Sequence, residues 1–328
     1  MAIEFNRDIG DFDYGKVDRV SPMIRRVIAE NPGRFTYTGT GTYLVGNGGG
    51  VAVIDPGPTL PVHIDAIVDA LEPGEHISHI LITHTHSDHS PGAVPIKERS
   101  GAQTWGQGPH GELGPDEPED RISFDEFLTE QEKAEIAAER EKTPEELLRE
   151  GPDTDFVPEN VVGHGDIIEG DGWSFECVHT PGHTSNHLCF QLREEKALFS
   201  GDHVMGWSTS VIGPPDGSMR MYLDSLRLLL DRDDELYWPT HGPAIANPQT
   251  YVSNFIDHRM AREDQITQAL ANGPSTIKEM VPGMYADVDK RLWRAAAASV
   301  FAHMMNMIET DRVTSDGTPR ITSVFALA

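Results

Sequence analysis

The residues that most constrain the fold form one short cluster, His84-Thr85-His86-Ser87-Asp88-His89. It directly follows residues 77–83, an apolar run with the length and composition of a buried strand. Ligands of open α/β sheets bind at such carboxyl ends of strands. A lone histidine is usually structural or solvent-exposed, but three imidazoles and a carboxylate together are the donors that a divalent cation such as zinc takes.

Three later segments, 179–184, 200–203 and 240–243, each place a metal-capable residue in a short turn after an expected strand. The residues are His183, Asp202 and His241. Glycine or proline beside each one allows the chain to turn sharply at a sheet edge. Unrelated turns explain this ordered recurrence poorly, so we expect these side chains to meet the first cluster.

Alternating strand and helix patterns predict an α/β domain over residues 1–246. Strands are expected at 17–28, 34–45, 51–55, 77–83, 166–168, 173–178, 188–192, 196–199 and 237–240, and helices at 61–71, 89–100 and 224–230. Residues 247–328 are expected to form a second domain. Its long helix would begin at an Asn247 cap followed by Pro248, and helices at 276–281 and 289–309 with a strand at 320–328 give a winged-helix order.

An acidic insertion at 106–160 interrupts the α/β pattern. Residues 110–160 hold 18 acidic and five basic residues, and the capping-box forms at 129–132 and 143–146 predict two short charged helices. A solvated helical insertion is the favoured interpretation, and a lid over the metal site is the alternative. Phe124, Phe127 and Phe156 would line a lid or anchor the insertion to the core.

Charge and hydropathy exclude several classes of protein. The net charge is −27, and residues 250–328 hold eight basic and nine acidic residues, which argues against nucleic-acid binding. A mean hydropathy of −0.39 and the lack of a run of ~20 apolar residues argue against a membrane protein. The first residues lack an export signal, and Cys177 and Cys189 fit core positions better than a disulfide, so we expect a cytoplasmic protein.

The complete set of motifs resembles the metallo-β-lactamase superfamily over residues 15–245. The resemblance implies a four-layered αββα sandwich that carries the insertion and a small C-terminal winged-helix-like domain. It also implies two divalent metal ions, with zinc favoured and manganese or iron as alternatives. His84, His86 and His183 would bind one ion, Asp88, His89 and His241 the other, and Asp202 would bridge them.

A metal pair of this kind predicts a hydrolase that acts on a small ester, thioester or lactone. Three neutral imidazoles leave the first ion's charge nearly unreduced, which favours a hydroxide bridging the pair as nucleophile, and Asp88 would accept its proton. The second domain, residues 247–328, looks like the C-terminal tail of the β-lactamase-like-protein-2 branch, so an endoribonuclease or phosphodiesterase is one alternative. An iron-dependent sulfur dioxygenase is another. The third is a non-enzymatic nucleic-acid or dimerisation module.

Weaker expectations concern residues near these motifs. Asp55 would support a ligand histidine or be an ordinary turn residue, and His187 and His203 would orient ligands, contact substrate or be core histidines. His110 receives no role. Residues 205–222 are expected to form one wall of the pocket. The apolar helix at 289–309 would pack within the tail or join two chains as a homodimer.

Overall fold

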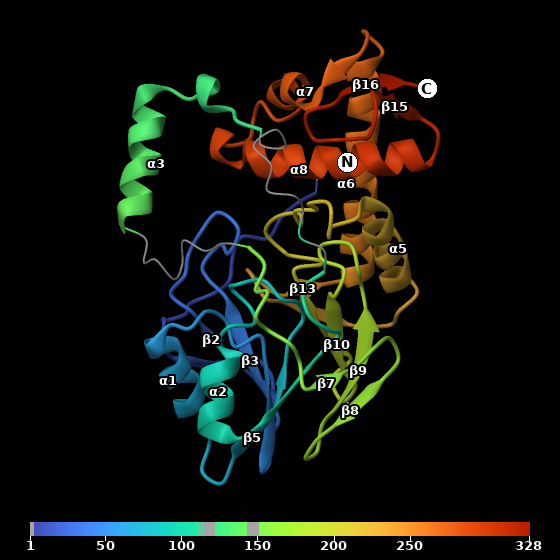
Figure 1. The fold of residues 1–328 in the computed structure, drawn as a ribbon. Coiled ribbons are helices and arrows are strands. Elements are labelled where there is room, and N and C mark those ends of the chain that lie inside the picture. The colour runs from blue at the N-terminus through green and yellow to red at the C-terminus, as the bar shows by residue number, and fades with distance from the viewer. Residues whose placement is uncertain (1–2, 112, 114–121, 143–150) are drawn as a thin grey trace.

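The computed structural model describes residues 3–111, 113, 122–142 and 151–328. Two β-sheets pack face to face, and helices cover their outer faces (Figure 1). A C-terminal domain of helices and a small sheet lies beyond one end of this sandwich (Figure 1). The described part of the chain therefore has the layered architecture that the sequence predicts.

The first sheet contains seven strands within the described residues, in the order in which they occur along the chain. They are β1 (Val17–Arg19), β2 (Ile24–Ile28), β3 (Gly41–Val45), β4 (Gly50–Ile54), β5 (His76–Leu81), β6 (Gln103–Gly106) and β7 (Asn160–Val161). Strands β1 to β4 form an antiparallel meander, whereas β4, β5, β6 and β7 run parallel to one another.

The second sheet contains six strands within the described residues, in the order β13-β12-β11-β10-β9-β8. They are β8 (Ile167–Glu169), β9 (Ser174–His179), β10 (Leu188–Leu192), β11 (Ala197–Gly201), β12 (Leu236–Pro239) and β13 (Ile245–Ala246). Among these six strands, only β11 and β12 pair in parallel, because the connection between them crosses over through a helix.

Side chains alternate between the two faces of each sheet, as the pleat of a strand requires. In β10, Leu188, Phe190 and Leu192 point into the layer between the sheets, while Cys189 points to the outer helices. Strand β4 likewise sends Ala52 inward. The burial of both strand faces explains why these segments are almost continuously apolar.

Helices form the two outer layers. The helices α1 (Pro61–Asp69) and α2 (Ala93–Ser100) cover the first sheet, and α5 (Met219–Leu230) and α6 (Pro248–Leu270) cover the second. Helix α1 buries Ile64 and Ile67 against β4 and β5. These layers complete the expected four-layered αββα sandwich.

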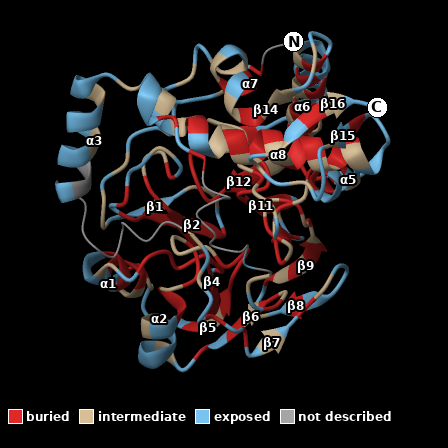
Figure 2. Ribbon diagram, turned by 45° about the horizontal axis from the view of Figure 1, so that its top comes forward, coloured by how far each residue is buried: buried red, intermediate tan, exposed pale blue. Residues whose placement is uncertain are grey.

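The C-terminal domain has its own core. It contains α7 (Ile277–Met284), the 3₁₀ helix η3 (Lys290–Leu292) and α8 (Trp293–Glu309), with a sheet of β14 (Ser275–Thr276), β16 (Val324–Leu327) and β15 (Val313–Ser315). Val300, Met304 and Met307 of α8 are buried there, together with Phe325 of β16. Figure 2 shows much of α8 in the colour of buried residues. The apolar side of α8 is thus covered by its own chain, and a homodimer stays a prediction.

The acidic insertion packs on the C-terminal domain. It contains the 3₁₀ helix η2 (Asp125–Phe127) and the largely exposed helix α3 (Glu130–Lys142) (Figure 2). Phe124 and Phe127 both contact Trp293, with ring centroids 5.7 and 5.6 Å apart, whereas Phe156 packs in the core beneath the first sheet. These aromatic residues are therefore anchors. The second capping box, at 143–146, lies outside the described residues.

Several local predictions are confirmed and others are wrong. The Thr129 and Glu132 capping box forms, because each side chain accepts the other residue's backbone N–H, at 3.1 and 2.6 Å. Asn247 precedes α6, but its side chain makes no capping bond; its φ is 57°, and Pro248 starts the helix instead. The strand expected at 34–45 begins only at Gly41.

Helix α5 begins earlier than the sequence pattern indicated. Ser218 accepts a hydrogen bond from the backbone N–H of Met221, and this cap starts the helix at Met219 rather than at 224. Part of the expected pocket wall at 205–222 is therefore helical. In the part of the chain that the structure describes, none of the helices combines the length and apolar character needed to cross a membrane.

Candidate metal centre

The candidate ligands come together because four strand ends lie at one edge of the sandwich. Strands β9 and β11 are each antiparallel to β10, and β12 is parallel to β11, so all three end on the same side. Two hydrogen bonds tie this side to the first sheet, from Leu188 N to Thr83 O at 2.7 Å and from Gly41 N to Thr240 O at 2.8 Å. The turns after β5, β9, β11 and β12 therefore face one another.

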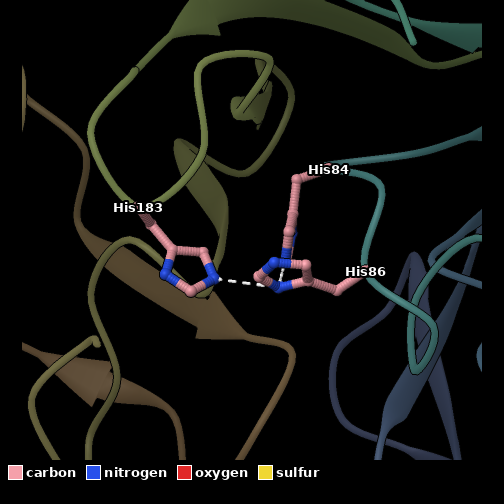
Figure 3. Close-up of side chains that lie close together, drawn as sticks. All are labelled: His84, His86 and His183. Carbon is pink, nitrogen blue, oxygen red and sulfur yellow. Dashed lines mark hydrogen bonds between the residues drawn. The ribbon is translucent and has the colours of Figure 1, made fainter. Parts of the chain in front are cut away.

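Three histidines converge on one point of this edge. His84 and His86 come from the turn after β5, and His183 comes from the turn after β9 (Figure 3). His86 Nδ1 lies 2.9 Å from His84 Nε2 and 3.2 Å from His183 Nε2. These three nitrogens form one group that could hold a metal ion.

A second group contains Asp88, His89 and His241. The Oδ2 atom of Asp88 lies 3.1 Å from His241 Nε2 and 3.6 Å from His89 Nε2. Asp202 stands between the two groups: its Oδ1 is 3.5 Å from His241 Nε2 and 3.6 Å from His89 Nε2, and its Oδ2 is 3.9 Å from His183 Nε2. Each oxygen of this carboxylate therefore faces a different group.

The distances and the lack of other partners fit a pair of cations. Ligand atoms about 2.0–2.1 Å from a tetrahedral zinc ion are about 3.3 Å from each other, close to the separations observed here. Within the described residues, the buried atoms His89 Nε2, His241 Nε2 and Asp202 Oδ1 have no hydrogen-bond partner. Buried polar atoms are rarely left without one, so these atoms fit metal ligands.

The electrostatics of the three-histidine group favour neutral imidazoles. Burial and the neighbouring His183 lower the pKa of His86 to about 3, and burial and His89 lower the pKa of His84 well below its usual value. Burial also lowers the pKa of His183. Neutral rings keep a lone pair available, which is the form that binds a metal ion.

The electrostatics around the second group, Asp88, His89 and His241, favour positive charge. Burial opposes ionisation of Asp88 and Asp202, but the adjacent His89 and His241 outweigh it and hold the pKa of both carboxyl groups below the usual range. Burial likewise opposes a charge on His89, yet Asp88, Asp202 and Asp55 raise its pKa well above the usual value. Two ionised carboxylates thus make this part of the site favourable for positive charge.

Asp55 supports the second group from beneath. Its buried carboxylate accepts hydrogen bonds from His89 Nδ1 at 2.9 Å, Thr83 N at 2.8 Å, Thr83 Oγ1 at 2.7 Å and Thr240 Oγ1 at 2.7 Å. The bond to Nδ1 orients the ring and leaves Nε2 facing Asp88 and Asp202. The sequence left two roles open for Asp55, support of a ligand histidine or an ordinary turn residue. These hydrogen bonds agree with the first role.

Backbone carbonyl groups orient two further rings. Val211 O lies 2.6 Å from His183 Nδ1, and Gly39 O lies 3.3 Å from His241 Nδ1. A carbonyl oxygen only accepts, so each of these Nδ1 atoms carries a proton, and in the neutral form of each ring the lone pair is on Nε2. These contacts join distant segments, and sequence patterns gave no sign of them.

His187 and His203 lie behind the ligands. Both are fully buried, and His187 Nε2 accepts a hydrogen bond from Asp202 N at 3.2 Å, which fixes the backbone of that residue. Gly201 makes room for this contact: its φ is 51°, and a Cβ atom there would lie 2.5 Å from His187 Nε2. His203 stacks near Tyr222, with ring centroids 4.6 Å apart, and its pKa is lowered to about 3 by burial and by His183.

A cavity of about 950 Å³ opens above the site. His86, Asp88, His183 and Asp202 line it at the metal centre, and α6 and α8 line it from the C-terminal domain. Residues 207–211 form part of its wall, as expected from the sequence. His110, to which the sequence assigned no role, also lines the cavity, with its ring centroid 6.0 Å from that of His86.

Comparison with known proteins agrees with this architecture. Residues 38–241 match the family described as the metallo-beta-lactamase superfamily, and residues 276–321 match the beta-lactamase associated winged helix domain. A crystal structure of a beta-lactamase domain protein from Burkholderia ambifaria has a TM-score of 0.74 and 19% identity, and covers 99% of this chain and 98% of its own. A metallo-beta-lactamase family protein from Thermus thermophilus has a TM-score of 0.69 and 22% identity, and covers 94% of this chain and 100% of its own. Both show the same fold.

Curated relatives are similar over most of the chain. An atrochrysone carboxyl ACP thioesterase of Aspergillus novofumigatus is 30% identical over 83% of this chain and 73% of its own length. A beta-lactamase-like protein 2 homolog of Caenorhabditis elegans is also 30% identical, over 83% of this chain and 79% of its own length. The chain therefore belongs to the metallo-β-lactamase superfamily, as an enzyme of that fold with the associated winged-helix domain.

Proposed function

We propose that this chain is a metal-dependent thioester hydrolase. The observation that carries the proposal is the arrangement around Asp202, whose two carboxylate oxygens face two separate groups of ligands. Two relatives that bear a thioesterase name, from Aspergillus novofumigatus and Aspergillus chevalieri, are 30% and 27% identical and cover 83% and 90% of this chain. Their name narrows the hydrolase to the thioester class.

The geometry of the site supports the proposed ligand set. His84, His86 and His183 would hold one divalent ion through neutral imidazole nitrogens. The other ion would be held by Asp88, His89 and His241, with Asp202 shared. When bound, such a pair lowers the pKa of an attacking water and polarises the carbonyl oxygen of a substrate. Imidazole and carboxylate donors favour zinc, with manganese or iron as alternatives.

Asp88 would accept the proton that the attacking water loses. Its side chain lines the cavity and is 25% exposed, whereas that of Asp202 is 13% exposed. Asp88 therefore reaches the space where water and substrate meet. The histidines around it keep the carboxyl group ionised, the form that accepts a proton.

The cavity also fits a long acyl thioester better than a very small ester. A volume of about 950 Å³ lies at the upper end of the range for small-molecule sites, roughly 300–1,000 Å³. Phe35, Met205 and Trp207 contribute apolar surface to its walls. An acyl chain would bury its hydrocarbon part against them while its carbonyl carbon lies over the metal centre.

A substrate panel tests this proposal. The metal-loaded protein would be assayed against an acyl thioester, the matching oxygen ester, a lactone, a β-lactam and a phosphodiester, beside protein stripped of metal. We expect thioester hydrolysis well above the stripped control, and its near-complete loss in Asp202→Asn. Asp171→Asn, at an exposed turn that caps Gly49, is the matched control and should keep full activity.

Other outcomes of the panel would replace the proposal. Turnover of the phosphodiester alone would favour the phosphodiesterase alternative, and oxygen uptake on a persulfide by an iron-containing protein would favour the dioxygenase. Thioester turnover that persists after metal removal would contradict metal dependence.

A further inference from the structure

The C-terminal domain supplies one wall of the cavity above the metal centre. Helix α6 contributes His258, Arg259 and Arg262, the residue after α7 contributes Tyr285, and α8 contributes Ser299. A winged-helix domain is thus used here as part of a pocket. Apolar side chains of Val288, Leu292, Ala295 and Ala296 complete this wall, and its charged members are the two arginines. The metal centre alone does not explain their positive charge.

The charge balance of this wall is the reverse of that of the whole chain. The sequence holds 53 acidic and 26 basic residues. Among the described residues that α6 contributes to the cavity wall, however, the charged ones are Arg259 and Arg262, and neither is acidic. Positive groups in a confined space are costly unless an anion faces them. This wall therefore suits a negatively charged ligand.

Arg262 presents a guanidinium group that is already oriented. Its Nη1 donates to Gln265 Oε1 at 2.7 Å and to Met284 O at 2.9 Å, and the group lies 4.2 Å from the ring centroid of Tyr285. All three contacts are with uncharged groups. Both hydrogen bonds use Nη1, so Nε and Nη2 keep donors that match the two oxygens of a carboxylate or phosphate.

Arg259 adds positive charge behind Arg262. It is 3% exposed, its Nη2 donates to Ser210 O at 2.6 Å, and it lies 5.0 Å from the centroid of the Tyr222 ring. Its Nε is a buried donor that has no partner within the described residues. The carbonyl group and the aromatic ring that Arg259 contacts are both uncharged. These contacts therefore leave the positive charge of Arg259, which lines the cavity, without a neutralising partner among its described contacts.

Neighbouring titratable groups do not cancel this charge. Glu263 follows on the same helix, but Arg312 Nη1 at 2.6 Å and Asn306 Nδ2 at 2.7 Å bind its carboxylate. His303 also contacts Glu263, and its pKa is lowered by burial. Burial and Arg259 lower the pKa of His258 to about 3, so this ring is a neutral lining residue.

We propose that Arg262, supported by Arg259, binds an oxyanion group of the substrate, a carboxylate or a phosphate, at the wall that the C-terminal domain supplies. The inference rests on the proposed thioester hydrolysis and narrows its substrate class to acyl thioesters that carry negative charge. That charge lies either on the acyl chain, as a carboxylate, or on the thiol side, as a phosphate. Helix α6, which precedes residues 276–321 that match the winged-helix domain, is then a specificity element of the enzyme.

Three substrates separate the two sources of charge. Pentanoyl-N-acetylcysteamine is neutral, glutaryl-N-acetylcysteamine adds a carboxylate to the acyl chain, and pentanoyl-coenzyme A adds phosphates to the thiol side. Each would be assayed with the metal-loaded wild type, Arg262→Gln and Arg262→Lys. Arg227→Gln is the matched control, because Arg227 is exposed on α5 and pairs only with Asp224 among its described contacts.

We expect the Arg262 variants to be impaired with only one of the two charged substrates. Loss of a charge-assisted hydrogen bond should raise KM in Arg262→Gln about tenfold for the substrate whose anion is bound, with kcat and the neutral substrate little changed. Arg262→Lys should have an intermediate effect, because it keeps the charge but loses the planar fork. Arg227→Gln should behave as the wild type with all three substrates.

A binding measurement separates this inference from the proposed function. Non-hydrolysable thioether analogues of the three substrates would be titrated calorimetrically into the same metal-loaded proteins. Anion affinity that depends on Arg262 without turnover of any thioester would overturn the proposed function and support the anion site. Equal KM and affinity changes for charged and neutral ligands, or none in either Arg262 variant, would overturn the anion site.

Discussion

The Asp55 carboxylate connects residues that are far apart in the sequence. Thr83 and His89, which follow β5, and Thr240, which follows β12, all donate hydrogen bonds to it. Its own φ of 47° is unusual for a residue with a side chain. One buried anion thereby sets the orientation of a ligand ring and holds two turns together. All of these partners donate hydrogen bonds, so this position requires a side chain that only accepts.

Asp55→Asn should weaken metal binding with little loss of shape. One carboxylate oxygen would become an amide that donates, and it would face groups that also donate. We expect a 10- to 100-fold loss of affinity for the metal ion at the Asp88, His89 and His241 group, as is usual when support of a ligand histidine is removed. Metal content measured against a competing chelator checks this, with Asp171→Asn as control. Unchanged affinity would show that Asp55 has no part in orienting His89.

Gly201→Ala should disturb the site through the backbone. A Cβ atom there would lie 2.5 Å from His187 Nε2 and 2.9 Å from Thr83 Oγ1, in addition to the strain of a positive φ. Gly165→Ala is the matched control, because Gly165 also has a positive φ, 85°, but open space around it. In urea unfolding we expect a loss of about 1 kcal/mol at Gly165 and at least about 3 kcal/mol at Gly201. Equal losses at both positions would contradict the packing described for Gly201.

The candidate ligands could be named from the sequence, whereas the contacts that support them could not. His84, His86, Asp88 and His89 are adjacent in the chain, so their chemistry is visible as a local pattern. The contacts of His183 with Val211 O and of His241 with Gly39 O depend on how distant turns meet, and no local pattern encodes that. The place of His110 in the cavity wall depends on the same tertiary arrangement.

At the scale of elements, the acidic insertion is attached to the C-terminal domain by a few contacts. Phe124 is 6% exposed and Phe127 is 38% exposed, and both pack against Trp293. Ion pairs join Glu126 to Lys278 at 2.5 Å and Glu132 to Lys290 at 3.3 Å. Exposed ion pairs contribute at most about 1 kcal/mol each, so the aromatic contacts dominate this attachment.

Phe124→Ala should release the insertion from the C-terminal domain. Truncation of a buried phenylalanine costs about 3 kcal/mol or more, and the more exposed Phe127 should cost less in Phe127→Ala. Hydrogen exchange of residues 122–142 measures the effect directly. Faster exchange in Phe124→Ala than in Phe127→Ala is the expected order, and the reverse order would mean that Phe127 is the main anchor.

Helices α6 and α8 are joined by the buried Glu263, whose ionisation makes stability depend on pH. Burial raises the pKa of Glu263, but His303, Arg312 and Asn306 outweigh it and lower the pKa to about 2, from 4.5. A lowered pKa in the folded state stabilises the fold above about pH 4.5, and this contribution is lost as the pH falls toward 2.

Glu263→Gln should therefore lower the free energy of unfolding at pH 7 by about 2 kcal/mol, allowing for the partial exposure of Arg312. At pH 3 the difference between variant and wild type should be smaller, because Glu263 is protonated in the unfolded chain below about pH 4.5 while the folded chain still holds it ionised, so the ionised form contributes less to stability. Glu309→Gln, at an exposed pair with Arg220, is the control. Urea unfolding at both pH values checks this, and a difference that grows at pH 3 would contradict the assignment.

Element boundaries show where sequence patterns were insufficient. The apolar runs of β4 and β10 and the helical spacing in α1 and α8 were visible in the sequence, because these strands are buried on both faces and these helices on one. The sequence pattern predicted that helix α5 begins at residue 224, five residues after its actual start at Met219. The cap at Ser218 was missed because it follows a segment that lines the cavity. Residues 34–40 alternate like a strand but form turns, where tertiary contacts outweigh the local pattern.

At the scale of the whole molecule, the winged-helix domain and the negative charge have opposite implications for nucleic acid. A net charge of −27 repels a polyanion, and the positive side chains of α6 point into the cavity wall rather than form an outer stripe. We therefore expect the C-terminal domain to shape the substrate pocket.

Nucleic-acid binding should accordingly be very weak. Fluorescence anisotropy with a labelled RNA oligonucleotide should give a Kd no tighter than about 10⁻⁴ M at physiological salt. The same titration at rising salt shows whether phosphate contacts contribute, since such contacts weaken steeply with salt. Tight binding that falls with salt would instead support the nucleic-acid alternatives.

The dependence of thioester hydrolysis on added metal tests the central claim most directly. Zinc would be titrated into metal-free protein, with bound metal and turnover measured on the same samples. Two ligand groups that share Asp202 predict that activity rises until about two ions are bound per chain and is abolished again by a chelator. Full turnover by the metal-free protein, or saturation of activity without binding of any ion at these residues, would contradict the account.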